Sequence, residues 1–331
     1  MKNAHLRRSR GASPLTPHPS RFPPLLRRTA SGLFSMNRLF SAALATLMIF
    51  AASAGAARAS DPTEYRMAER PLFSLGIGLD YETGDYGTGS DSDFVSVPLY
   101  IDFYPSERLD FELIIPYVYQ SLEDGDVSTV VYRTSGGSAA GAVRGRRAAA
   151  TTDSTTTTTT TTTTTKSRDT SESGLGDITL TAGYVLIEEN SGTPQIRPTF
   201  YLKFPTADED KGLGTGEFDF GPGLTVAKWL GDWHLFAEGV YVVQGDSDLY
   251  DSQDYFRYNG GLGYQLNDGL YGAVQAVGAT APADGADEAL EGRLKLVWRP
   301  VADVAFEGYV GTGLSDGSAD FTSSLAVFFD F

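Results

Sequence analysis

The chain lacks cysteine altogether, has few histidines and is poor in basic residues. Its 331 residues include 3 histidines and no cysteine, and 26 lysines and arginines stand against 42 aspartates and glutamates. Without cysteine, neither disulfide bonds nor thiolate metal sites can hold the fold. The formal net charge of −16 leaves no basic surface to neutralise phosphates, which excludes nucleic acid as a partner.

Long apolar runs are missing as well. After the first sixty residues no stretch is apolar for long enough to form a transmembrane helix, and residues 44–52 are too few to span about 30 Å of hydrocarbon. This apolar stretch follows a basic leader and precedes Ala-Arg-Ala at residues 57–59, the pattern of a signal-peptidase site. We therefore expect residues 36–59 to be a secretory signal peptide and residues 1–35 to be a mis-assigned extension.

Cleavage before Ser60 makes the chain still more acidic. The leader contains nine basic and no acidic residues, so its removal changes the net charge from −16 to −25. The Arg- and Ser-rich leader also fits a mitochondrial transit peptide, but the cleavage site favours bacterial secretion. If the mature chain crosses a membrane, it must cross with strands.

The end of the chain, residues 321–331, has a period of two. Alternate positions carry large apolar side chains, with Ser323 as the one exception. Such alternation predicts a strand with one apolar and one polar face. Lipid outside and water inside impose this pattern on every strand of a transmembrane barrel. An aromatic carboxyl terminus is also the expected signal for the barrel-assembly machinery of the bacterial outer membrane, and the signal residues here are Phe329 and Phe331.

Twelve segments of the chain alternate in this way, and the loops between them are alternately short and long. Short turns on one side and long acidic loops on the other are typical of an outer-membrane barrel with periplasmic turns and external loops. We therefore predict an all-β fold over residues 60–331, a transmembrane antiparallel up-and-down β-barrel of about twelve strands in the bacterial outer membrane. The predicted strands are residues 73–81, 94–103, 109–119, 177–187, 195–204, 217–230, 233–244, 255–266, 270–280, 289–298, 304–311 and 321–331.

One long loop, residues 123–176, has the composition of a disordered segment. It contains eleven consecutive threonines, residues 155–165, and too few large apolar residues to pack. We expect it to be a solvated external loop. The barrel itself would contact outer-membrane lipid. Four of the loop's basic residues are candidates for contact with anionic lipopolysaccharide: Arg133, Arg144, Arg146 and Arg147.

Signals for catalysis are weak. His234, the one histidine after the leader, falls at the start of a strand beside a periplasmic turn. We expect it to lie with Trp233 in the periplasmic aromatic belt, where amphipathic rings favour the headgroup level. A nucleophile and a base within hydrogen-bond reach of each other are not indicated. The prediction is a protein without enzymatic activity, and an outer-membrane lipid or peptide hydrolase is the remaining alternative.

Two short patterns suggest ligands at first sight. Residues 212–216, Gly-Leu-Gly-Thr-Gly, look like a phosphate loop, but a strand rather than a helix follows. The acidic loop with Asp246, Asp248, Asp251 and Asp254 lacks the glycine and the closing glutamate of a calcium loop. We therefore predict no cofactor and no metal.

The polar rows of the strands carry charge of both signs. These side chains either pair completely and close the interior, or line a wet pore that selects solutes. Eight-stranded barrels are filled by side chains and barrels of sixteen to eighteen strands leave an open channel, so twelve strands predict a narrow pore or a binding cavity. The pore-lining candidates are Glu112, Asp219, Arg197, Lys203, Glu238, Arg257, Glu291, Arg293, Lys295 and Glu307.

Four segments carry a resemblance to a known family. They are residues 174–178 (Gly-Leu-Gly-Asp-Ile), 202–206 (Leu-Lys-Phe-Pro-Thr), 214–221 and 313–321. Over residues 73–331 the chain resembles the bacterial outer-membrane proteins of the phenol meta-pathway type. That resemblance implies a β-barrel transporter for passive diffusion of small solutes, among them hydrophobic or aromatic ones. A structural or adhesive barrel with a closed lumen is the main alternative.

Overall fold

The computed structural model describes residues 71–86, 92–122, 131–134, 156–159, 170–246, 252–283 and 286–331. The predicted extension and signal peptide, residues 1–59, lie outside these ranges. Within the ranges, no helix is long and apolar enough to cross a bilayer. The wall of the molecule consists of strands β1 (Phe73–Gly84), β2 (Ser92–Phe103), β3 (Leu109–Leu122), β7 (Ile178–Tyr184), β8 (Gln195–Phe204), β9 (Asp219–Leu230), β10 (Trp233–Val242), β11 (Tyr255–Asn267), β12 (Leu270–Ala279), β13 (Ala289–Val301), β14 (Val304–Gly313) and β15 (Phe321–Asp330).

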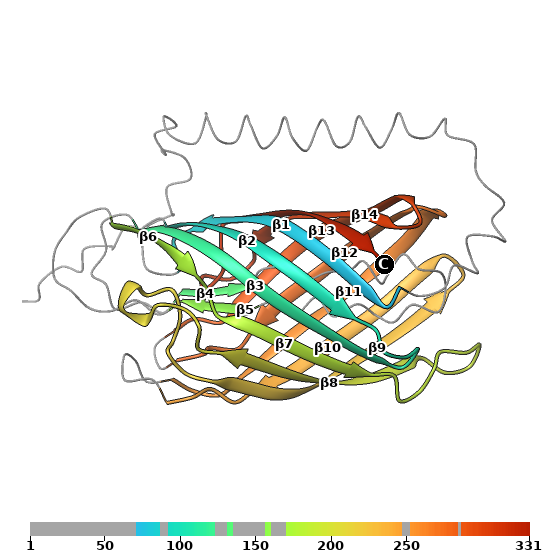
Figure 1. The fold of residues 1–331 in the computed structure, drawn as a ribbon, viewed down its shortest axis with the longest axis horizontal. Coiled ribbons are helices and arrows are strands. Elements are labelled where there is room, and N and C mark those ends of the chain that lie inside the picture. Colours follow the sequence, from blue (N-terminus) through green and yellow to red (C-terminus); the bar gives the residue numbers. More distant parts are fainter. Residues whose placement is uncertain are drawn as a thin grey trace, which may run out of the picture. The chain divides into compact units, whose positions relative to one another are not determined.

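These twelve strands form a closed antiparallel barrel (Figure 1). Each strand pairs with its neighbours along the chain, and β1 pairs with both β2 and β15, so that no edge of the barrel sheet is left open. The closure extends to the final residue, because the Phe331 backbone N–H donates to the Phe73 carbonyl oxygen at 2.8 Å. The predicted twelve-stranded barrel is confirmed. The role of Phe329 and Phe331 as an assembly signal stays a prediction.

The connections confirm the predicted asymmetry between the two ends. On one end, β9 and β10 are joined by residues 231–232 alone, with Gly231 at φ 68°, a left-handed conformation that suits glycine. The β13–β14 turn is shorter than the sequence suggested, since β13 continues to Val301 and β14 begins at Val304. The longest connections, those after β3, β8 and β10, lie at the opposite end, which we take as the external one; the β7–β8 connection, residues 185–194, is the longest at the turn end.

The long loop after β3 differs from its prediction in two places. Strand β6 (Thr170–Leu175), expected to be part of the loop, pairs with β3 and extends the wall beyond β7. Within the loop, β4 (Val131–Thr134) pairs with β5 (Thr156–Thr159), so a segment expected to be disordered pairs in a two-stranded ribbon. Thr is β-branched, and such side chains favour extended backbone. The remaining loop arginines, Arg144, Arg146 and Arg147, lie outside the described residues.

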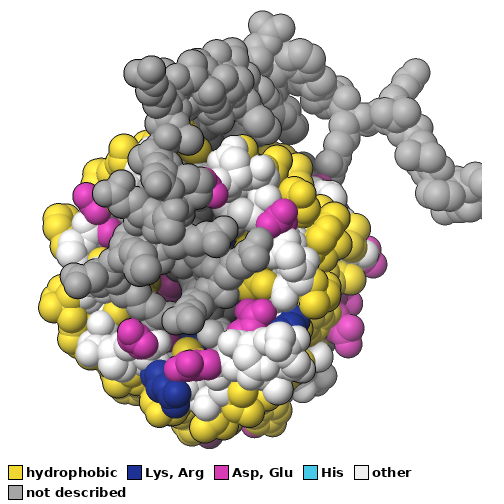
Figure 2. Space-filling view, turned by 90° about the vertical axis from the view of Figure 1, so that its right-hand side faces the viewer, with side chains coloured by type: hydrophobic (Ala, Val, Ile, Leu, Met, Phe, Trp, Pro, Cys, Tyr) yellow, Lys and Arg dark blue, Asp and Glu magenta, His cyan; other side chains and the backbone are white. Residues whose placement is uncertain are grey.

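The outward faces of the strands are apolar. Leu75, Ile77 and Leu79 of β1 are each at least 40% exposed. Ser74, just before them, and Asp80, just after them, are buried. Figure 2 shows hydrophobic side chains around the circumference of the barrel and charged ones on its end. Outward aromatic pairs, such as Trp233 with Tyr264, occur near the ends of the strands. An apolar band with aromatic girdles is the lipid-facing surface of an outer-membrane barrel, which confirms the predicted location.

Candidate functional site in the barrel interior

The ten predicted pore-lining side chains all lie on the inward rows of their strands. Nine of them are buried, and the tenth, Glu112, is half-buried. Outward neighbours on the same strands, such as Leu294 between Arg293 and Lys295, are exposed. The period of two therefore places these charges toward the lumen. That they line a path for solutes stays a prediction.

Most of the inward basic side chains make an ion pair within the wall. The pairs join positions two apart on one strand, neighbouring strands, or strands separated by one other strand, so each depends on the period of two or on the register of the sheet. They are Arg293 with Glu291 at 2.9 Å, Lys295 with Glu307 at 2.7 Å, Arg299 with Asp330, and Arg197 with Asp110, whose Nε–Oδ1 distance is 3.1 Å.

Three members of these pairs, Arg299, Asp330 and Asp110, were not predicted as pore-lining residues. Arg299 was assigned to a turn, but β13 continues past it, and the inward row that holds Lys295 and Val297 reaches Arg299 next. Its partner Asp330 lies on the polar row of the last strand. Extending the period of two by one step would have identified Arg299.

The inward carboxylates are not evenly distributed. From β7 to β15, six inward acidic residues face six inward basic residues: Asp177, Asp219, Glu238, Glu291, Glu307 and Asp330 against Arg197, Lys203, Arg257, Arg293, Lys295 and Arg299. We call this part of the interior the paired sector. The adjacent strands β1, β2 and β3 carry five inward acidic residues and, among the described residues, no inward basic residue. This acidic wall consists of Asp80, Glu82, Asp102, Asp110 and Glu112.

Two carboxylates of the acidic wall stand directly opposite each other. Asp102 of β2 and Glu112 of β3 are Cα partners in the antiparallel ladder. Like charges at such positions repel, because directly opposed side chains on one face lie close together. Tyr104 lies in the turn that follows Asp102, and burial raises the pKa of its phenol well above the ordinary value, with a further contribution from Asp102 and Asp110. The wall therefore ends in a neutral hydroxyl.

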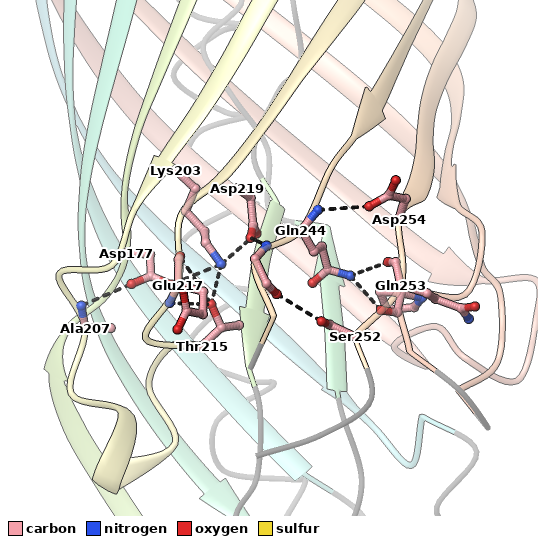
Figure 3. A network of polar contacts seen from close by, with 12 residues as sticks. Asp177, Lys203, Ala207, Thr215, Glu217, Asp219, Gln244, Ser252, Gln253 and Asp254 are labelled. Carbon is pink, nitrogen blue, oxygen red and sulfur yellow. Dashed lines mark hydrogen bonds and ion pairs between the residues drawn. The ribbon is translucent and has the colours of Figure 1, made fainter. Parts of the chain in front are cut away.

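A buried polar cluster lies at the external end of the paired sector (Figure 3). Lys203 of β8 places its Nζ 2.6 Å from Asp219 Oδ2 and 3.6 Å from Asp177 Oδ2, and donates to Thr215 Oγ1 at 2.7 Å. The lysine and both carboxylates are at most 3% exposed at the side chain. Complete removal from solvent requires such pairing, because a lone buried charge is strongly destabilising.

The cluster unites the sequence segments that carry the family resemblance. Thr206 Oγ1 donates to the Gly176 carbonyl oxygen and accepts from the Ile178 N–H, both at 2.9 Å. The Ala207 N–H donates to Asp177 Oδ1 at 3.1 Å. Residues 174–178, 202–206 and 214–221 are far apart in sequence, and the register of β7, β8 and β9 brings them together.

The loop between β8 and β9 folds inward from this cluster. It contains a short 3-10 helix, η3 (Glu209–Lys211), which ends at Gly212 in a left-handed conformation. Leu213 is fully buried, and Gln120 of β3 donates through Nε2 to the Gly212 carbonyl oxygen at 3.3 Å. The sequence predicted an external acidic loop here, whereas these contacts hold its tip against the inner side of β3. As expected from the strand that follows, no phosphate-binding helix succeeds residues 212–216.

The prediction for His234 is wrong. Trp233 faces outward, as expected, but His234 is 2% exposed and faces inward. Neighbouring residues of a strand point to opposite faces, so the two rings cannot share the aromatic belt. His234 instead stacks on Trp229 with ring centroids 4.3 Å apart, and its Nδ1 lies 3.0 Å from the Tyr271 hydroxyl.

Other inward rings lie near the basic side chains of the paired sector. The Arg257 guanidinium lies 4.5 Å from the centre of the Tyr201 ring, and that of Arg293 lies 4.4 Å from the centre of the Tyr309 ring. Stacking on an aromatic face favours a guanidinium as a cation–π contact. The interior thus offers flat aromatic faces as well as charge.

No group of three or more histidine, aspartate or glutamate side chains within the described ranges is arranged to hold a metal ion. Of the acidic loop considered for calcium, Asp248 and Asp251 lie outside those ranges. Asp254 accepts a hydrogen bond from the Tyr241 hydroxyl at 2.9 Å and contacts the Gln244 N–H at 3.3 Å.

Solved structures with a similar fold are outer-membrane barrels. The COG4313 outer membrane channel from Pseudomonas putida F1 shares 17% identity with this chain at a TM-score of 0.54, covering 82% of this chain and 100% of that one. The KdgM porin is more distant, with 10% identity and a TM-score of 0.43 over 78% of this chain and 99% of the porin. The first likeness supports the barrel fold. No curated protein matches the chain.

The sequence itself matches a family model. The match spans residues 94–331, from β2 to the carboxyl terminus, and so includes nearly the whole barrel. It contains the buried cluster around Lys203 and most of the acidic wall. The chain therefore belongs to the family described as "Putative MetA-pathway of phenol degradation".

Proposed function

We propose that this protein is an outer-membrane channel for passive diffusion of small solutes, with a preference for cations. The observation that carries the proposal is the acidic wall. In the paired sector acids and bases are equal in number, so the entire inward excess of five carboxylates lies on β1, β2 and β3. An interior whose only task was stability would not retain like charges opposite each other, as Asp102 and Glu112 are.

Several inward polar atoms point to a hydrated lumen. Among the described residues, Asp102 Oδ2, Thr225 Oγ1 and both side-chain amide atoms of Asn259 have no hydrogen-bond partner. Polar groups removed from bulk solvent need partners, because leaving them unpaired costs about 1–3 kcal/mol each. Water in the lumen would satisfy them. In such a lumen carboxylates stay ionised and attract counter-ions.

Small aromatic molecules are the solute class that we propose. The family description refers to phenol degradation, and the similar Pseudomonas structure is described as a channel. Phe236 of β10, an inward ring that is partly exposed, would offer such solutes a flat contact surface. An enzymatic role is not part of the proposal, because His234 pairs with Tyr271 and not with a nucleophile and an acid. Assembly machinery and lipopolysaccharide remain proposed partners, the first through Phe331.

Planar bilayers with the purified mature protein test this function. We expect discrete conductance steps and a reversal potential that indicates cation preference under a salt gradient. Glu112→Gln should lower that preference, since it removes an inward carboxylate of the acidic wall on β3. Silent bilayers across a range of voltages would overturn the proposal in favour of a closed structural barrel. Folding is checked in the same samples by faster electrophoretic migration of unheated protein.

A further inference from the structure

Three aromatic rings gather on the inner wall near the periplasmic turns. Trp229 of β9 and His234 of β10 are stacked with an angle of 13° between their planes, and Tyr271 of β12 lies 6.1 Å from Trp229, centre to centre. Phe236, two residues after His234, lies 5.3 Å from the imidazole and is partly exposed. Ala273 and Val297 pack against the same group.

The wall provides room for this arrangement at one glycine. Gly263 of β11 is the direct cross-strand partner of His234. A Cβ at this position would overlap the Tyr271 hydroxyl, so the glycine allows the tyrosine to lie flat across β11 and reach the imidazole. The rings therefore cover the wall instead of crossing the lumen.

Two polar atoms of this group have no hydrogen-bond partner in the part of the chain that the structure describes. His234 Nδ1 contacts the Tyr271 hydroxyl at 3.0 Å, but His234 Nε2 and Trp229 Nε1 contact no hydrogen-bonding atom of the described residues. His234 is 2% exposed and Trp229 is 8% exposed. A buried N–H without a partner is costly, and such groups in native proteins call for water or a ligand.

The chemistry of the two atoms defines the ligand that fits. An indole N–H can only donate, whereas imidazole Nε2 donates or accepts according to its tautomer. A hydroxyl group can accept a hydrogen bond from the indole N–H. It can also form a hydrogen bond with imidazole Nε2 in either tautomer, as donor or as acceptor. A flat ring attached to that hydroxyl would pack against Phe236 and the apolar side chains beside it, since aromatic rings favour stacked or edge contacts.

We infer that Trp229, His234 and Tyr271 form a binding subsite for a small aromatic alcohol of the phenol type. The inference rests on the proposed channel function only in that the solute reaches the site through the lumen. Trp229 Nε1 donates to the solute hydroxyl, His234 Nε2 takes the second bond, and Tyr271 fixes the imidazole through Nδ1. Phe236 forms the side on which the ring enters.

Intrinsic fluorescence offers a direct test, because the chain has only three tryptophans. Trp233 and Trp298 lie on outward rows, so the variant Trp233→Phe/Trp298→Phe reports from Trp229 alone. The matched variant Trp229→Phe/Trp298→Phe reports from the outward Trp233. In detergent micelles we expect phenol to change Trp229 emission with saturation and to leave Trp233 without a saturable change. Excitation at the red edge of the indole band avoids absorption by phenol.

Toluene serves as the control ligand, because it has the ring without the hydroxyl. Loss of the hydrogen bonds should weaken its binding at least about tenfold relative to phenol. His234→Phe keeps the ring and should weaken phenol binding about tenfold. Calorimetric titration of the wild type and of His234→Phe repeats the comparison without a fluorophore. Equal responses of Trp229 and Trp233, equal binding of phenol and toluene, or no saturable binding in either measurement would overturn the subsite.

Bilayer conductance of the wild type, measured beside its phenol binding, separates this inference from the proposed function. Conduction by the wild type without phenol binding would remove the subsite and leave the channel. Phenol binding in a barrel that does not conduct would leave the subsite and remove the channel.

Discussion

The acidic wall and the paired sector belong to one barrel interior but differ in how their charges are arranged. Carboxylates stand beside bases in the paired sector and beside other carboxylates on the acidic wall. In the paired sector Glu291, Glu307 and Asp330 each form an ion pair with an inward basic residue. Lys203, Asp177 and Asp219 form a cluster that is closed to solvent. On the acidic wall, Asp102 and Glu112 are direct neighbours of the same sign. Ion pairing stabilises the fold. Repulsion between carboxylates lowers stability, and their negative charge attracts cations into the lumen. We infer that the paired sector stabilises the barrel and that the acidic wall selects solutes.

An ion pair joins the two sectors across β7. Arg197 of β8 reaches past β7 to Asp110 of β3, with an Nε–Oδ1 distance of 3.1 Å. Gly183 of β7 lies beneath the guanidinium, and a Cβ there would overlap it. Asp110 is therefore a carboxylate of the acidic wall whose charge is matched by a base of the paired sector.

The largest effect is expected where a buried base is removed from the paired sector. Lys203→Met retains the volume of the side chain but leaves Asp177 and Asp219 without their cation. Breaking one partner of a buried ion pair costs about 3–5 kcal/mol, so the free energy of unfolding should fall by that amount. Denaturant titration followed by heat-dependent electrophoretic migration measures it.

Lys211→Met is the matched control for this loss. Lys211 lies 3.4 Å from Asp208 in the loop after β8, and its side chain is 45% exposed. Pairs open to solvent contribute about 0–1 kcal/mol, so this variant should remain close to the wild type. Equal losses for the two lysines would show that the Lys203 cluster does not hold the wall.

The next effect concerns the contact between the sectors. Gly183→Val should displace the Arg197 guanidinium from Asp110 and lower the free energy of unfolding by about 2 kcal/mol, as overpacking and a lost ion pair do. It should also raise cation preference, because Asp110 loses its counter-charge. Reversal potentials in a salt gradient check this direction. A stable variant with lowered cation preference would contradict the assignment of Asp110 to the acidic wall.

Ion selectivity should follow the acidic wall and not the paired sector. Asp102→Asn/Glu112→Gln removes two inward charges, and the cation-to-anion permeability ratio should fall about fivefold if each charge contributes on the order of one kT of potential. Lys295→Met/Glu307→Gln removes a pair joined at 2.7 Å without changing the net charge, and should leave the ratio near the wild-type value. A larger change in the second variant would reverse the roles of the two sectors.

The sequence predicts features that depend on neighbouring residues better than contacts between residues far apart in the chain. The inward direction of Glu291, Arg293 and Lys295 follows from the period of two alone, and the structure agrees. The same rule separates Trp233 from His234, and applying it strictly would have placed the imidazole inside. Local alternation is therefore sufficient to predict which face a side chain occupies.

Partners across strands could not be predicted in this way. The Arg197–Asp110 pair joins residues 87 positions apart, and it depends on the order of the strands around the ring. The inward path of the loop after β8 depends on the Lys203–Thr215 contact, for which loop composition gives no signal. The division into an acidic wall and a paired sector appears only when β1, β2 and β3 are known to be adjacent.

The smallest expected effect is a gain of stability on the acidic wall. Asp102→Asn removes one of two like charges that are direct cross-strand partners, while its amide keeps the shape of the carboxylate. Opposed like charges destabilise a ladder by about 0.2–1 kcal/mol, so the free energy of unfolding should rise by about 0.5 kcal/mol. Salt should reduce this gain, since screening weakens the repulsion in the wild type. Denaturant midpoints at low and high salt measure both. A loss of stability comparable with that of Lys203→Met would show instead that Asp102 is held by a partner, and the distinction between the two sectors would fail.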